Sequence, residues 1–422
     1  MPPQRQLGLV SASALVVASM IGSGVFTTSG FLLADLQTPG RVLAAWLGGG
    51  VLALLGALCY GALARRFPES GGEYLFLART LHPAAGYLAG WVSLLVGFSA
   101  PLAAVALAFG EYARHWLPFS APLATGTCLL VALAAVHGIH VQRGAWVQNI
   151  AVLAKLLLIL LLLGCAGARL QPSPPPVVSG YSASDFAVAL VWISFSYSGW
   201  NAAVYIGSEV RDPERNLPRA MVWSTALVTL IYLALNAVFV YAAPVEQLSG
   251  KLDLARLAAE ALGGRALANL VTVLIALALA TAGSSMMMSG PRVYARMADD
   301  GCFPKWFRFP VQGPPRRAVV LQTTLALAML WSATFESLLT YIGFTLGLCT
   351  AAAVAGLIRL RLREGPQLRV AGWPWAPAAF VAGTLAITGF TIARKPVESA
   401  VGLSTLLLGW IAWHISQRRK RR

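Results

Sequence analysis

The sequence predicts an all-α integral membrane protein with twelve transmembrane helices. Of its 422 residues, 57% are apolar and only 11% are charged, and the mean hydropathy is +0.68. Soluble proteins need more charged surface than this, so the composition places most of the chain in a bilayer. Two of the apolar stretches are interrupted at their centres by glycine and serine, which points to a functional site inside the membrane.

Each predicted crossing is a stretch apolar enough to pass a hydrocarbon core of roughly 30 Å, which takes about 20 residues. The stretches occupy 7–36, 41–64, 84–113, 121–139, 147–168, 184–209, 217–243, 267–297, 318–334, 337–358, 374–392 and 397–415. The first is too long for the apolar part of a signal peptide and is expected to be retained. Between them, the proline-rich 171–180 is expected to be an external connector and 248–264 a short amphipathic helix.

The two interruptions share a register. The first stretch contains "MIGSGVF" at 20–26 and the sixth contains "FSYSGWN" at 195–201. Because an odd number of crossings reverses direction, spans 1–5 (7–168) and spans 6–10 (184–358) are predicted to form inverted repeats. Spans 11–12 (374–415) follow them, so residues 1–422 make a single membrane domain.

A break in a membrane helix frees N–H and C=O groups that need partners. Amides at the start of the half-helix after the break suit a carboxylate, and carbonyls ending the preceding half-helices suit an ammonium group. An amino acid carries both groups, and Gly22 and Gly24 let it approach the backbone closely. The alternative is that these glycines only allow close helix packing.

The distribution of positive charge predicts the orientation. One set of alternate loops, together with both tails, carries 23 of the 32 Lys and Arg residues, and the other set carries 8. By the positive-inside rule, both termini are predicted to be cytoplasmic, in the cell membrane. The net charge of +16 is explained by this pattern, and no nucleic-acid partner is expected. Glu209 and Asp212 are expected to form an intracellular cluster with Arg211, Arg215 and Arg219.

Catalytic and metal-binding patterns are not predicted. The five cysteines show no CxxC spacing, and His137 and His140 have no third ligand near them in the sequence. Paired carboxylates, HExxH and Ser/His/Asp sets are also missing from the spans. An enzyme, a cofactor and a metal site are therefore not expected.

Five motifs together resemble the amino acid–polyamine–organocation (APC) superfamily, and within it the L-amino-acid transporter branch. They are "MIGSGVF" (20–26), "FPESGGEYLFL" (67–77), "FSYSGWN" (195–201), "EVRDPERNLPRA" (209–220) and "RVYARMADDGCFP" (292–304). The resemblance spans the first ten crossings. It implies a leucine-transporter-type 5+5 inverted repeat with broken helices 1 and 6, and recognition of the α-amino-acid group by backbone atoms.

The resemblance also implies roles for particular residues. The amides of Ser23 and Gly24 would hold the carboxylate, the carbonyls of Met20, Phe195 and Ser198 the ammonium group, and the Phe195 ring would be the gate. The full set of expected substrate-binding residues is Met20, Ile21, Gly22, Ser23, Gly24, Phe195, Ser196, Ser198, Trp200 and Asn201. Relatives tethered to an accessory chain use a cysteine in the loop that here reads "EYARHWLPFSAP" (111–122), so no disulfide-linked subunit is expected.

Lys155 lies inside the fifth stretch with no acidic residue in the same span. An intramembrane lysine is a functional hypothesis by default. The resemblance implies contact with a carbonyl of the first span and with the hydroxyl of Ser284 or Ser285. Lys155 would either exchange a proton during transport or stay charged and brace an exchanger. The alternative is a lysine that extends toward the cytoplasmic surface.

The acidic residues fall at span ends or in loops, so the sequence predicts no midplane carboxylate for a cationic side chain. A secondary transporter of neutral L-amino acids is therefore expected, by proton symport or amino-acid exchange. Two alternatives remain: a cationic amino acid or polyamine antiporter, since aromatic rings can also hold cations, and a non-transporting sensor. A sensor would be expected to carry a long tail, whereas "SQRRKRR" follows the last span directly.

Overall fold

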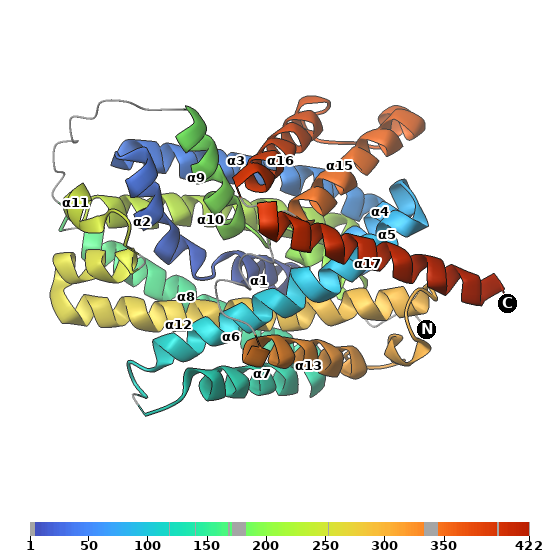
Figure 1. Cartoon of the computed structure of the whole chain (residues 1–422), viewed down its shortest axis with the longest axis horizontal. Helices are drawn as coiled ribbons and strands as arrows, with labels where there is room; N and C mark the ends of the chain where they lie inside the picture. Colours follow the sequence, from blue (N-terminus) through green and yellow to red (C-terminus); the bar gives the residue numbers. More distant parts are fainter. Residues whose placement is uncertain are drawn as a thin grey trace.

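The computed structural model describes residues 5–117, 119–139, 141–167, 169–170, 183–251, 253–332, 345–394 and 396–421. These residues form helices joined by turns, with an isolated β-bridge between Leu7 and Val210. Most of the long helices run roughly side by side, and α1 (Leu9–Met20) lies in the middle of the bundle (Figure 1). The predicted connector at 171–180, His140 and the first part of the 337–358 stretch lie outside the described residues.

The first half of the chain begins with two short helices, α1 and α2, and contains the long helices α3 and α8. Their bounds are α1 Leu9–Met20, α2 Gly24–Leu36, α3 Pro39–Arg66, α4 Gly72–Thr80, α5 Pro83–Val92, the π-helix η1 Ser93–Ser99, α6 Ala100–Ala113, α7 Pro122–Ile139 and α8 Val141–Gly167. Thr38 caps α3 through its side chain, and Pro39 occupies the first helical position, where a missing N–H costs nothing. The helix α4 lies between the second and third predicted crossings.

The second half begins in the same way, with the short helices α9 and η2 followed by the long helix α10. Its elements are α9 Ala183–Ser196, the 3₁₀ helix η2 Ala202–Glu209, α10 Pro213–Val240, α11 Val245–Leu248, α12 Leu254–Asp299, η3 Lys305–Phe307, α13 Arg316–Ser332, α15 Thr345–Glu364, η4 Gly365–Gln367, α16 Trp375–Arg394 and α17 Pro396–Arg421. The helix α12 bends at Gly263 and Gly264, where the backbone leaves helical geometry. Its first turns therefore supply the short helix expected within 248–264.

Within the described residues, eight helical segments are long and apolar enough to cross a membrane. They are 9–36, 39–66, 83–113, 122–139, 144–167, 213–240, 254–299 and 375–393. The other predicted crossings correspond to shorter helices, or to helices with several arginines near one end, such as α15 with Arg359, Arg361 and Arg363. The chain is thus an all-helical, multi-pass membrane protein.

The core of the bundle forms around α1 and α10. The helix α1 packs against α8, α10 and α12, and α3 packs along α10. A buried polar chain connects α3, α2 and α10: the Trp46 indole donates to Ser29 Oγ (2.8 Å), and Ser29 Oγ donates to Asn236 Oδ1 (2.5 Å). Hydrogen bonds of this kind matter more where no water can replace them.

One buried ion pair ties α12 to the end of η2. The Arg292 guanidinium donates to both carboxylate oxygens of Glu209, at 2.8 and 2.6 Å, and both side chains are almost fully buried. The expected cluster of Glu209 with Arg211, Arg215 and Arg219 is therefore wrong. Arg211 instead donates to the Gln6 carbonyl, because η2 ends with Glu209 facing α12 rather than the start of α10.

This pairing predicts a large stability difference between single and double variants. Arg292→Met leaves a buried, unpaired carboxylate, which costs about 3–5 kcal/mol. Arg292→Met combined with Glu209→Leu removes both charges and should recover most of that loss. Thermal unfolding of the detergent-purified proteins measures the difference. Equal melting temperatures for the single and double variants would contradict it.

Candidate functional site

The first interruption is present in the structure. The helix α1 ends at Met20, Ile21 leaves helical geometry (φ −80°, ψ 84°), and α2 begins at Gly24. Between them the Gly22 amide donates to the Met20 carbonyl at 2.9 Å. The first amides of a helix have no acceptor within that helix. The N-terminal end of α2, with its positive dipole, therefore faces the break.

The second interruption is also present. The helix α9 ends at Ser196, a turn covers 197–201, and η2 continues from Ala202. The Ser198 amide donates to the Phe195 carbonyl at 3.1 Å, and Gly199 has φ +99°. A left-handed backbone at this position favours glycine.

The two interruptions lie directly against each other. A Cβ on Gly24 would stand 2.5 Å from Ser196 Oγ and 3.1 Å from Ser196 Cα, and one on Gly199 would stand 2.5 Å from Ser19 Oγ and 2.8 Å from its carbonyl carbon. Both glycines are therefore needed for the approach of one broken helix to the other. The Thr28 and Ser196 hydroxyls also lie 3.0 Å apart.

A tyrosine from α10 connects the ends of both broken helices. The Tyr232 hydroxyl lies 2.5 Å from the Met20 carbonyl and 3.0 Å from the Ser196 carbonyl, so it can donate to either. The Met20 carbonyl lies within hydrogen-bond distance of the Tyr232 hydroxyl and also accepts from the Gly22 amide. Its predicted contact with a substrate ammonium group stays a prediction.

A cavity of about 480 Å³ opens beside the two interruptions. Its size is that of a small-molecule site. Of the ten expected binding residues, the cavity is lined by nine, namely Met20, Gly22, Ser23, Gly24, Phe195, Ser196, Ser198, Trp200 and Asn201. Ile21 is fully buried behind the wall. Spatial proximity of the two motifs is thus observed, while the role of each residue stays a prediction.

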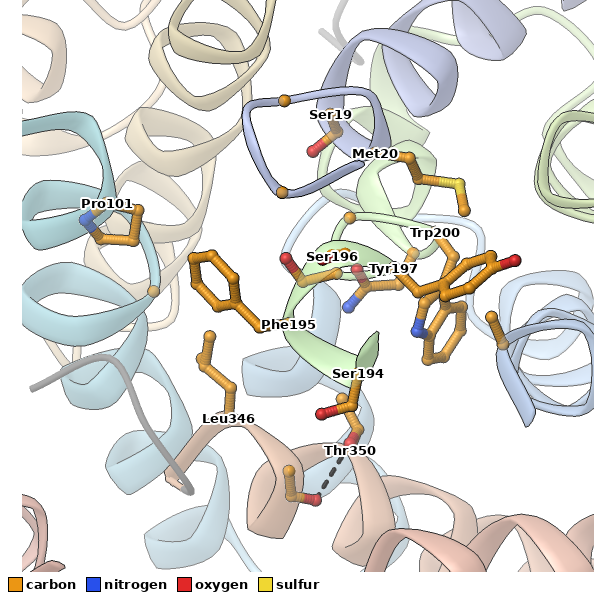
Figure 2. Close-up of a pocket in the computed structure, with 18 of the residues that line it drawn as sticks. Ser19, Met20, Pro101, Ser194, Phe195, Ser196, Tyr197, Trp200, Leu346 and Thr350 are labelled. Carbon is orange, nitrogen blue, oxygen red and sulfur yellow. Dashed lines mark hydrogen bonds between the residues drawn. The ribbon is translucent and has the colours of Figure 1, made fainter. Parts of the chain in front are cut away.

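Phe195 projects across the cavity. Figure 2 shows its ring extending from the end of α9 toward Pro101 on α6 and Leu346 on α15. Its side chain is 40% exposed, unlike the buried Tyr197 and Trp200 that follow it. Trp200 packs edge-on against Tyr60 and Phe380, so it braces the wall.

Lys155 is fully buried and contacts the back of the first break. Its Nζ donates to the Ile21 carbonyl at 3.0 Å and to Thr281 Oγ1 at 2.8 Å. The expected contact of Lys155 with the hydroxyl of Ser284 or Ser285 is wrong. Ser284 Oγ instead lies 2.7 Å from His137 Nε2, and Ser285 Oγ donates to the Leu15 carbonyl. Thr281 lies one helical turn before Ser285 in α12, beside the break at Ile21. Ser285 lies beside Leu15, more than one turn earlier in the first helix.

Glu73 is a charged cavity residue that was not expected from the sequence. It lies in the first turn of α4, is only 4% exposed and lines the cavity. Its position near a span end suggested a surface carboxylate. The sequence signal for burial is the place of Glu73 in the motif "FPESGGEYLFL", after two glycines and before an apolar run.

The fold and this site define a class: a multi-pass membrane protein with a small-molecule cavity between two broken helices. The described residues contain no group of three or more His, Cys, Asp or Glu side chains able to hold a metal. His137 is buried against Ser284.

The chain belongs to the amino acid permease family, whose model matches residues 7–413. It is 28% identical to the mouse "large neutral amino acids transporter small subunit 2" over 96% of this chain and 80% of that protein. It is 29% identical to the rabbit "b(0,+)-type amino acid transporter 1" over 85% of this chain and 76% of that protein. The human protein of the second name is 33% identical over 55% of this chain and 50% of its own length. The resemblance to the APC superfamily is thus confirmed; this is a family of transporters and not of enzymes.

The contact between the breaks predicts an effect of one added methyl group. Gly199→Ala should destabilise the protein by about 2 kcal/mol or more, because the Cβ would overlap the Ser19 backbone at a positive φ. Gly164→Ala in α8 is the matched control, since no atom lies within 4 Å of its added Cβ. Melting temperatures of both variants in detergent measure this. A Gly199→Ala protein as stable as the control would contradict the packing.

Proposed function

We propose that the chain is a secondary active transporter that moves amino acids across the cell membrane by alternating access. One observation carries this proposal: two broken helices meet at one cavity that could hold an amino acid. A broken helix is costly in a membrane unless its backbone groups gain partners, and a bound zwitterion would supply them.

In this proposal, the amides of Ser23 and Gly24 at the start of α2 bind the substrate carboxylate, helped by the helix dipole. The carbonyls of Phe195 and Ser198 at the end of α9 bind the ammonium group. The Phe195 ring is the gate, because it extends across the cavity (Figure 2). Ile21 acts indirectly, through its bond to Lys155.

We further propose twelve crossings arranged as a leucine-transporter-type 5+5 inverted repeat. Residues 7–168 would be the first repeat, 184–358 the inverted repeat and 374–415 the last two crossings. The matching breaks in α1–α2 and α9–η2 support this division. Both termini would be cytoplasmic, as the positive charge predicts. No disulfide-linked accessory subunit is expected, since 111–122 contains no cysteine.

Neutral L-amino acids are the preferred substrates in this proposal. The cavity wall is mostly apolar and aromatic, and one group of similar proteins is named for large neutral amino acids. A cationic amino acid or polyamine antiporter is the second candidate. The buried Glu73 in the cavity wall favours it. A non-transporting sensor would bind amino acids without uptake.

Lys155 is the proposed coupling residue, because it joins the first break to α12 through Ile21 and Thr281. A large movement of the first break away from α8 or α12 would break one of these bonds. Proton symport would require Lys155 to lose and regain its proton. In amino-acid exchange it would remain a fixed cation.

Transport into liposomes tests the proposal. Purified protein should take up labelled leucine into vesicles preloaded with unlabelled leucine. A pH gradient imposed across otherwise empty vesicles distinguishes symport from exchange, because only symport would then accumulate substrate. Binding of leucine without uptake in either arrangement would favour the sensor and reject transport.

Removal of the buried lysine tests the coupling. Lys155→Ala should slow leucine uptake by at least about tenfold, since Ile21 and Thr281 lose their shared partner. Lys305→Ala, in the exposed loop after α12, is the matched control and should transport at the normal rate. Size-exclusion chromatography checks that both variants are folded. Normal uptake by Lys155→Ala would reject both coupling modes.

A further inference from the structure

Glu73 holds a distinctive place in the cavity wall. The wall is otherwise formed by neutral side chains, so that among the lining residues the structure describes, Glu73 alone is charged. The stretches 171–182 and 333–344, outside the described residues, contain no lysine, arginine or histidine in their sequence. Among its described lining residues, the cavity therefore carries one acidic group and no basic group to balance it.

The hydrogen-bond partners of Glu73 are all neutral. Oε1 accepts from the Tyr60 hydroxyl at 2.9 Å and from Asn201 Nδ2 at 2.5 Å, and Oε2 accepts from the Tyr205 hydroxyl at 2.5 Å. Three donors on one carboxylate suit its acceptor-only, ionised form, and a carboxylate has about four acceptor positions. The partners hold the group in place without cancelling its charge.

The buried cations of the described residues are occupied elsewhere. Lys155 donates to Ile21 and Thr281 and does not line the cavity. Arg292 is paired with Glu209. No ion pair between Glu73 and a basic side chain occurs in the described part of the chain. In a site with little water, one uncompensated charge acts strongly on any charged group that enters.

We propose that Glu73 selects substrates by the charge of their side chain, admitting neutral and basic amino acids and excluding acidic ones. This inference rests on the proposed transport function and adds a determinant of specificity to it. The α-carboxylate and α-ammonium groups of every amino acid cancel in net charge, so only the side chain distinguishes one substrate class from another. A basic side chain can fill the remaining acceptor position of Glu73, whereas an acidic one is repelled.

Competition against labelled leucine uptake in liposomes tests this with two pairs of nearly equal shape. Glutamate and glutamine differ in charge but hardly in size, as do arginine and citrulline. In the unchanged protein, glutamate should compete at least about tenfold less well than glutamine, and arginine at least as well as citrulline. In Glu73→Gln the disadvantage of glutamate against glutamine should shrink by about tenfold, and arginine should compete less well relative to citrulline than it does in the unchanged protein.

Tyr60→Phe is the matched control. It removes one hydrogen bond to Glu73 but keeps the charge, so absolute affinities should change while the two ratios stay as in the unchanged protein. Equal ratios in Glu73→Gln and the unchanged protein would overturn the proposal. If Glu73→Gln does not fold, equal competition by glutamate and glutamine in the unchanged protein overturns it as well. A lack of any leucine uptake by the unchanged protein would instead reject the proposed transport function.

Discussion

The structure depends on how the backbone groups of two broken helices are satisfied inside a membrane. Water cannot supply the missing partners there, so side chains from unbroken helices must do so. The Tyr232 hydroxyl lies within hydrogen-bond distance of the Met20 and Ser196 carbonyls, one from each break. The Lys155 ammonium group donates to the Ile21 carbonyl. Ser23 and Gly24, at the start of α2, line the cavity.

Small residues make this arrangement possible. Gly24 and Gly199 allow the two broken helices to touch through their backbones, at distances that any Cβ would prevent. The aromatic rings of Trp46, Tyr197 and Tyr232 pack on each other beside this contact. Close backbone contact and rigid aromatic packing keep the breaks at fixed positions, which a binding site formed from peptide groups requires.

Among the residues that the structure describes, buried charge is distributed among three sites with different partners. Arg292 and Glu209 neutralise each other where η2 meets α12. Lys155 is held by one carbonyl and one hydroxyl. Glu73 is held by two tyrosines and an asparagine. Charges paired with each other chiefly stabilise contacts, whereas a charge with only neutral partners is free to act on a ligand.

The sequence alone determined the membrane class, the family and the location of both breaks, because apolar length and glycine or serine within it are local properties. It also singled out Lys155. Only the tertiary structure decided which groups meet: Thr281 rather than Ser284 or Ser285 at Lys155, Arg292 at Glu209, and Tyr232 at Met20. It also brought Glu73 to the cavity. Such contacts depend on the rotation and depth of each helix against its neighbours, which the periodicity within one helix does not specify.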